Sequence, residues 1–516
     1  MSILAASVLQ APSIAYSSLS PILIILGAAC IGVLVEAFVP AAARFPSQVG
    51  LSIVSIVASF IAVFAVRSHN GLTMAGAISI DSPALVSMGA ILVFGLLATM
   101  LFADRSLDSA GSVFVAEAAM PVGSRSDRAL LTSERVQTEV FPLSLFSIGG
   151  MMVFVAANNL LVMFIALEVL SLPLYLMAGL SRRKRLLSQE AALKYFLLGA
   201  FASGFFVYGL ALIYGFAGSI ELRAISTASR TITDHDSLLI LGMALLLVGL
   251  LFKAGVAPFH SWSPDVYQGS PSPVAGFMAA ATKFAAFIAI LRLMYVAFSG
   301  VPGVWTPVIS WIAIISMVVG ALIGLAQTDL KRLLAYSSIA HAGFILVGVT
   351  ANSVAGTAAT LFYTFTYGLS AIGAFALLSI VRREDGEATN MDDWKGMGKR
   401  SPMIAAAMTV MMLSMTGVPL TAGFIGKLQS FTAASASGHV WLIVVALVLS
   451  AITAVYYLRV IVFMYFYDAQ SDPATIVLPG TPTTSVIAIT TFATVLLGVI
   501  PGPLLHLVEV ASRFVA

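Results

Sequence analysis

Residues 238–262, LLILGMALLLVGLLFKAGVAPFHSW, run from a long apolar segment into a lysine, a glycine and a proline. A helix needs about 20 consecutive apolar residues to cross the hydrocarbon core of a bilayer. A charge at the centre of that core costs at least about 2.5–3.5 kcal/mol, so Lys253 needs a partner or a function there. Pro258 removes a backbone hydrogen bond and interrupts the helix. The stretch therefore predicts a membrane-spanning helix that is broken beside a buried lysine.

The rest of the chain has the same character. Of its 516 residues, 59% are hydrophobic and only 9% are charged, whereas soluble domains contain about 25% charged residues. The mean hydropathy of +1.02 leaves too little polar surface to face water. These values exclude a soluble enzyme, a secreted disulfide-linked domain and a nucleic-acid binder. They predict an all-α polytopic membrane protein, because backbone in lipid must satisfy its own hydrogen bonds.

Uninterrupted apolar stretches recur along the whole sequence and predict about fourteen transmembrane helices. These stretches lie near 19–39, 48–66, 83–103, 141–157, 159–180, 194–217, 237–259, 273–298, 307–326, 335–350, 354–381, 403–433, 440–467 and 484–509.

The positive charges predict the orientation of these helices. Sixteen of the 26 lysines and arginines fall in loops after odd-numbered stretches, and only four fall in the other loops. Because positively charged loops stay in the cytoplasm, both chain termini are predicted to lie outside. The longest polar segment, 104–140, is predicted to be a poorly ordered cytoplasmic insertion. A docking surface for a partner is the other interpretation of this segment.

Apart from Glu509, the last residue of the final stretch, eight charged residues fall inside the apolar stretches, where charges usually mark ion pathways or pairs. Arg292 and Arg459 lie toward the ends of their stretches, so we expect their side chains to extend to the interface. Glu36 is also expected at the interface. The other five are candidates for a proton path, although Lys194 lies at the edge of its stretch and fits either interpretation. They are Glu168, Lys194, Lys253, Lys283 and Lys427.

Two histidines and one carboxylate suggest how protons could be exchanged with these lysines. If Glu168 can pair with Lys253, the distance between them sets how tightly the lysine holds its proton. Histidine suits proton relay because its unperturbed pKa is about 6.5. His260 and His341 lie in or beside the apolar stretches and are predicted to take part.

A second break, TGVPLTAGFIGK at 416–427, indicates an internal repeat. Glu168 and His341 are 173 residues apart, and Lys253 and Lys427 are 174 apart. This near-constant spacing pairs stretches separated by five spans, so the second copy enters the membrane from the opposite side. It predicts two inverted five-helix repeats, with helices 7 and 12 broken and Lys427 in the place of Lys253.

The sequence contains no features of a bound cofactor. Its single cysteine, Cys30, cannot supply the four ligands of an iron–sulfur cluster or a structural zinc. No glycine-rich phosphate-binding motif is present. We therefore expect neither a cofactor nor a metal on this chain.

Several strings together resemble one known family. They are NNLLVMFIALEVLSLPLYLMAGL (158–180), EAALKYFLLGAFASGFFVYGLALIYG (190–215), LFKAGVAPFHSWSPDVYQGSPSPV (251–274), LKRLLAYSSIAHAGF (330–344) and GVPLTAGFIGK (417–427). They are similar to the antiporter-like membrane subunits of respiratory complex I, over roughly 141–467. Three such subunits occur in the complex. The resemblance implies that one of them has a glutamate at the position of Lys427, so the lysine found here favours another of the three. The runner-up is a subunit of a multi-subunit sodium/proton antiporter.

The resemblance implies a domain organisation. It consists of three N-terminal transmembrane helices (1–103), the polar insertion (104–140), a first inverted repeat (141–298), a second one (307–467) and a C-terminal helix (484–516).

The resemblance also implies a function and a site. The chain would translocate protons in a bacterial plasma membrane while quinone is reduced elsewhere in the complex. Its partners would be other membrane-arm subunits, which would carry NADH, FMN, iron–sulfur clusters and quinone. The proton path would contain Glu168, Lys253, Lys283 and Lys427, with Lys194, His341 and His260 as relay members.

Overall fold

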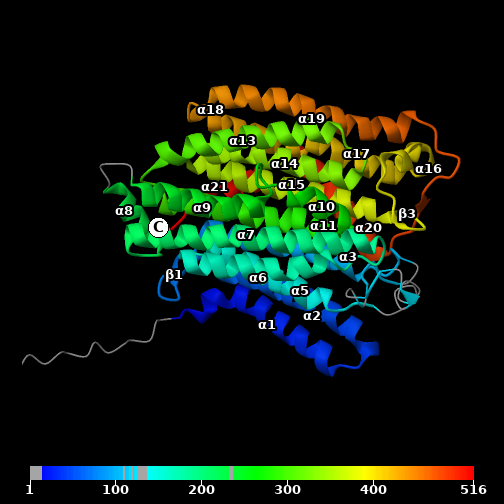
Figure 1. Cartoon of the computed structure of the whole chain (residues 1–516), viewed down its shortest axis with the longest axis horizontal. Helices are drawn as coiled ribbons and strands as arrows, with labels where there is room; N and C mark the ends of the chain where they lie inside the picture. The colour runs from blue at the N-terminus through cyan, green and yellow to red at the C-terminus, as the bar shows by residue number, and fades with distance from the viewer. Residues whose placement is uncertain are drawn as a thin grey trace, which may run out of the picture.

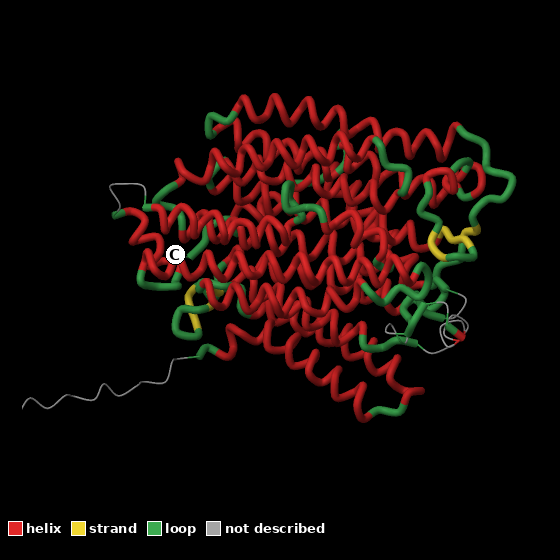
Figure 2. Tube along the Cα trace, in the orientation of Figure 1, coloured by secondary structure: helices red, strands yellow, loops and turns green. Residues whose placement is uncertain are grey.

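The computed structural model describes residues 14–108, 111–115, 117, 120–122, 124–125, 129, 136–231 and 236–515. Long helices run side by side along the longest axis of the molecule, and loops gather at its two ends (Figures 1 and 2). In the described part, twelve helical stretches are long and apolar enough to cross a membrane. Two shorter apolar helices, of 17 and 15 residues, accompany them. The chain is a multi-pass membrane protein.

The N-terminal helices pack along one side of the bundle. They are α1 (Tyr16–Phe38), α2 (Ala41–Ala65) and α3 (Ser82–Ala103). Strands β1 (Gly71–Thr73) and β2 (Ile78–Ile80) form an antiparallel hairpin between α2 and α3. Asp81 follows this hairpin and caps α3 by accepting a hydrogen bond from the Ala84 amide at 3.0 Å.

The first repeat contains five spans, of which the fourth is broken. Its elements are α5 (Val140–Ala156), α6 (Leu160–Ala178), α7 (Arg185–Ala217), the short α8 (Leu222–Arg230), α9 (Ser237–Ala254) with α10 (Trp262–Gly269), and a last span. That span joins α11 (Ser272–Phe277), η1 (Met278–Thr282), α12 (Lys283–Arg292) and η2 (Leu293–Ala297).

The second repeat has the same arrangement. Its spans are α13 (Pro302–Leu325), α14 (Leu330–Thr350), α15 (Val354–Ile380), α17 (Pro402–Thr416) with α18 (Ala422–Ala436), and α19 (Val440–Phe466). Between α15 and α17 lie β3 (Val381–Arg383), β4 (Gly386–Glu387), η3 (Met391–Trp394) and α16 (Met397–Arg400). The chain continues through β5 (Thr475–Ile476), α20 (Thr481–Val499) and α21 (Gly502–Val510), and β3 is the central strand of a β4-β3-β5 sheet.

The predicted fold class is confirmed. Each of the fourteen apolar stretches corresponds to a helix or to a broken pair, and helices 7 and 12 are broken as predicted. The two repeats also use matching contacts, since α5 packs on α6 as α13 packs on α14, and α9 on α12 as α17 on α19. The last stretch, predicted as one helix, is divided by Ile500 and Pro501 into α20 and α21.

Burial separates central helices from peripheral ones. The most apolar window of α14 is 100% buried, whereas those of α7 and α20 are 28% buried. The peripheral helices therefore present apolar side chains outward, as helices that face lipid or other membrane subunits do.

The loops segregate to two ends of the bundle. One end, called here the basic face, gathers the described residues of loop 104–139 together with loops 181–184, 326–329, 381–401 and 467–480, which contact one another. The other end, called the opposite face, gathers loops 66–81, 157–159 and 298–301 and the described residues of 218–236. In the 104–140 segment, Val113 and Val115 pair through their backbones with Arg182 and Leu180. Arg128 and Arg135 lie outside the described residues.

Candidate functional site

The first break places Lys253 in the interior of the bundle. Helix α9 ends at Ala254 because Gly255 adopts a left-handed conformation with φ of +68°, and Pro258 follows before α10 begins. Lys253 is only 3% exposed, and its Nζ donates a hydrogen bond to the Tyr195 hydroxyl at 3.0 Å. The Tyr195 ring stacks on Trp262, the first residue of α10. Both halves of the broken helix thus hold this lysine in place.

Lys283 lies beside the same break. Its helix contains a π-helical turn, η1, directly before the lysine. The Lys283 Nζ donates to the carbonyl oxygens of Ala254 at 2.7 Å and of Ser338 at 3.0 Å. The Ala254 carbonyl ends α9 and lacks a partner within that helix, and it carries the negative end of the helix dipole. A buried ammonium group is therefore stabilised here without a carboxylate.

The second break repeats this pairing with a different lysine. Helix α17 ends at Thr416, and Gly417 adopts a left-handed conformation with φ of +86°. Lys427 reaches back from α18 and donates to the carbonyl oxygen of Thr416 at 2.8 Å and the Ser450 hydroxyl at 2.8 Å. Its ammonium also lies 4.7 Å from the centre of the Phe344 ring.

The prediction that Lys427 takes the place of Lys253 is wrong in detail. When the breaks are aligned on their capping glycines, Lys253 lies two residues before Gly255 and Lys427 lies ten residues after Gly417. The residue that corresponds to Lys253 is Met415. Equal spacing in the sequence therefore does not mean equal position, because Lys253 lies before its break and Lys427 lies after its own.

His341 connects the two regions through tyrosines. Its Nδ1 lies 2.8 Å from the Tyr363 hydroxyl, and its Nε2 lies 3.1 Å from the Tyr457 hydroxyl. The Tyr457 hydroxyl also bonds to Ser337, the neighbour of the residue whose carbonyl receives Lys283. All of these side chains are buried. The tyrosines were not predicted, because a phenol within an apolar run does not stand out as a charged residue does.

Glu168 lies apart from its predicted partner. It is half-buried on α6, and the Ser203 hydroxyl of α7 donates to its Oε1. Its carboxylate lines a surface groove between α6 and α7. Among the described residues, no ion pair joins Glu168 to Lys253, which bonds to Tyr195 instead.

The remaining two predicted relay residues lie near the second half of the first broken helix. Lys194 forms ion pairs of 2.6 Å with Glu190 and with Asp265 of α10, and its side chain is 41% exposed. His260 lies in the break itself and is half-buried, and its Nδ1 has no hydrogen-bond partner in the described part of the chain.

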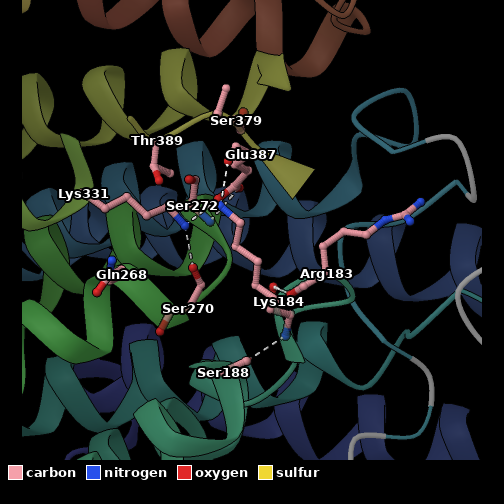
Figure 3. A network of polar contacts seen from close by, with 12 residues as sticks. Arg183, Lys184, Ser188, Gln268, Ser270, Ser272, Lys331, Ser379, Glu387 and Thr389 are labelled. Atoms are coloured by element: carbon pink, nitrogen blue, oxygen red, sulfur yellow. Dashed lines mark hydrogen bonds and ion pairs between the residues drawn. The ribbon is translucent and has the colours of Figure 1, made fainter. Parts of the chain in front are cut away.

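A polar cluster covers the junction between α10 and α11 at the basic face (Figure 3). Lys331, which the sequence placed in a loop, is 2% exposed; it forms an ion pair with Glu387 and donates to the Ser270 carbonyl at 2.7 Å. Glu387 also accepts a hydrogen bond from the Ser272 amide at 3.1 Å. Burial alone would raise the pKa of the Glu387 carboxyl, but Lys331 and Arg382 hold that pKa below its usual value. A cavity of about 40 Å³ adjoins this pair, which is room for a water molecule.

The predicted interfacial position of Arg292 is wrong. The Arg292 side chain is completely buried near the opposite face and binds Asp81 through two hydrogen bonds of 2.7 and 2.9 Å. Asp81 is more than 200 residues away in the sequence, so local position could not reveal it. Arg459 instead donates to the carbonyls of Leu325 and Gln327 at the end of α13.

Comparisons with known proteins agree on one family. A family model described as NADH:quinone oxidoreductase/Mrp antiporter, TM, matches residues 157–453, which include every predicted site residue. The chain is 52% identical over 508 residues to NADH-quinone oxidoreductase subunit N of Parafrankia sp. (strain EAN1pec), covering 98% of this chain and 97% of that protein. It is 53% identical over 503 residues to the protein of the same name from Saccharopolyspora erythraea, covering 96% and 97%. Among solved structures, a chain of respiratory complex I from Thermus thermophilus with bound aureothin aligns with a TM-score of 0.76 at 32% identity, covering 94% and 98%.

Proposed function

The chain belongs to the NADH:quinone oxidoreductase and Mrp antiporter family of membrane subunits, and from this membership we propose that it moves protons across the membrane as subunit N of an NADH-quinone oxidoreductase. Relatives about half identical over nearly the whole chain bear that name, which favours this function over a sodium/proton antiporter. Lys427 favours subunit N over subunit M, where the resemblance implies a glutamate at this position.

One observation carries the proposal. Buried polar groups lie between the two broken helices: Lys253 and Lys283 are at the first break, and a hydrogen-bonded row of Ser337, Tyr457, His341 and Tyr363 ends beside α18. Lys427 lies at the second break on that helix. Charged and polar groups are expensive in a membrane interior, and such rows of them mark ion pathways.

The contacts of the lysines allow their amines to bind and release a proton reversibly. Lys283 and Lys427 are held by carbonyl oxygens, which carry partial charges, rather than by carboxylates with a full charge. A proton leaving either ammonium therefore does not have to break an ion pair. His341 can accept a proton at one ring nitrogen and release one at the other, and the flanking hydroxyls can both donate and accept.

Glu168 is proposed to tune the first part of the path. Its carboxylate forms no ion pair with Lys253 in the described part of the chain, so a movement that brings the two groups together would make the lysine hold its proton more firmly. The domain boundaries predicted from the sequence are part of the same proposal. Each inverted repeat, 141–298 and 307–467, would form half of the proton path.

The orientation is also part of the proposal. The basic face is assigned to the cytoplasm of a bacterial plasma membrane, because that face collects most of the positively charged loops. NADH, FMN, iron–sulfur clusters and quinone are assigned to partner subunits. This chain would receive the energy of quinone reduction through contacts with other membrane-arm subunits.

The proposal is tested with the reconstituted complex carrying Lys283→Met. In proteoliposomes, NADH-driven acidification measured with a pH-sensitive dye should fall by at least about tenfold, because no ammonium then meets the Ala254 carbonyl. The matched control is Lys399→Met, whose side chain is 76% exposed at the basic face and which should pump normally. Normal pumping by an assembled Lys283→Met complex would reject the proposed path.

A further inference from the structure

An apolar groove opens on the outside of the bundle, and none of the proposed proton-path residues lines it. Its walls come from α2, α3, α15 and α21, and its volume is about 320 Å³. Phe60, Val93 and Phe365 are typical of its lining, and among the described residues that line it Arg67 is the one that is not apolar. Water has too few polar partners to fill such a space, and a dry groove in a membrane protein takes up apolar molecules instead.

The dimensions of the groove match one leaflet of a bilayer. Along α3 it extends from Leu85, in the first turn of the helix, to Val93. Eight residues of helix rise about 12 Å, and half of the hydrocarbon core is about 15 Å thick. The groove therefore begins at the opposite face and ends near the middle of the membrane, which is the depth reached by a lipid acyl chain.

A positive charge lies at the outward end of the groove. Arg67 follows the last residue of α2 by two positions and is exposed. Within the described residues its guanidinium has neither a hydrogen-bond partner nor an ion-pair partner. An arginine at a helix end lies at the level of the lipid headgroups, and its planar fork of donors fits phosphate oxygens.

We propose that this groove holds one acyl chain of an anionic phospholipid whose phosphate is bound by Arg67. The guanidinium donates charge-assisted hydrogen bonds to the phosphate, and the apolar walls enclose the chain. At the bottom of the groove lies Phe284, the residue after Lys283, so the lipid chain packs against the helix that carries this lysine.

The proposal is tested by counting phospholipids in the purified complex with native mass spectrometry. Gly89 faces the groove, and a methyl group there would meet only Phe60 at 3.7 Å, so Gly89→Leu fills the groove while Gly89→Ala does not. Arg67→Gln removes the charge, and Arg223→Gln removes an exposed arginine elsewhere on the opposite face. Wild type, Gly89→Ala and Arg223→Gln should retain one more phosphatidylglycerol than Gly89→Leu, and Arg67→Gln should retain it at least about tenfold more weakly. Equal counts in all five complexes would overturn the proposal and would indicate that a helix of another subunit fills the groove.

A second measurement does not depend on those variants. In a Cys30→Ser background, a fluorophore on Val86→Cys inside the groove is compared with one on Leu197→Cys, which lies on the exposed side of α7. After incubation with phosphatidylglycerol brominated on its acyl chains and removal of free lipid in detergent, only the fluorophore at position 86 should be quenched. Equal quenching at both positions, or none at position 86, would contradict the proposed site.

Discussion

In both broken helices, the carbonyl that ends the first half binds a lysine ammonium, but the two lysines come from different helices of their repeats. At the first break, the carbonyl that ends α9 receives the ammonium of Lys283 from a neighbouring helix, while Lys253 turns to the Tyr195 hydroxyl. At the second break, Lys427 of the continuing helix α18 binds the carbonyl that ends α17. What the fold repeats is an ammonium at the negative end of an interrupted helix, and not a residue at a fixed position. Among the described residues, two buried lysine amines lie beside the first break and one lies beside the second.

The largest effect is expected where one amine has no neighbouring substitute. Lys427→Arg keeps the positive charge but cannot release a proton at any working pH, so pumping should fall at least about tenfold. The same loss is expected for Lys427→Ala. Dye-based proton uptake in proteoliposomes measures both, with assembly checked by native gel. If Lys427→Arg pumps at the wild-type rate, position 427 needs only a fixed positive charge and does not carry a proton.

The next effect concerns the connection between the two breaks. Tyr457→Phe removes a hydroxyl that bonds to both Ser337 and His341. Losing a hydrogen bond of about 1 kcal/mol in the path should slow pumping by about fivefold and leave assembly intact. The control is Tyr467→Phe, whose side chain is 47% exposed at the end of the same helix. Equal rates for the two variants would remove Tyr457 from the path.

A smaller effect is expected from a variant that tests the alignment of the two breaks on their capping glycines. Met415 occupies the position that corresponds to Lys253, so the double variant Met415→Lys/Lys427→Met moves the amine across the break. It should pump about threefold faster than Lys427→Met alone, since the new ammonium can approach the freed carbonyls. The initial rate of dye quenching at fixed NADH oxidation compares the two. No gain would show that the approach from α18 is itself required.

The smallest effect concerns the basic face. The pKa of the Glu387 carboxyl is held low in the folded protein, so its stabilising contribution is present above the unfolded value of about 4.3 and disappears as the pH falls through the folded one. The melting temperature of wild type should exceed that of Glu387→Gln by about 1–2 °C above pH 5. Thermal scans in detergent should find this gap closing below pH 4. A gap that widens on acidification would contradict the assigned sign.

The sequence predicted those parts of the site that contrast with their surroundings. A lysine inside an apolar run, as at Lys253 or Lys427, is visible because its cost in a membrane is large. Proline beside each lysine indicated both broken helices, and the apolar lengths indicated all fourteen spans.

The partners of these residues could not be predicted in the same way. Arg292 binds Asp81 and Lys331 binds Glu387, and each pair is joined only by the fold. Likewise, the spacing that matched Lys253 with Lys427 was misleading, because sequence distance does not record where a helix is interrupted. Contacts across the bundle decide these points.

The π-helical turn before Lys283 has a consequence for the direction in which that lysine points. In η1, five residues occupy a turn that an α-helix would build with about four, so the turn accommodates one extra residue. Each residue of an α-helix advances by about 100° around the axis. If all five residues of η1 instead followed α-helical geometry, everything after them would be rotated by about that angle. Lys283 would then face away from the Ala254 carbonyl, so the orientation of this amine depends on the wide π-helical turn that absorbs one extra residue before it.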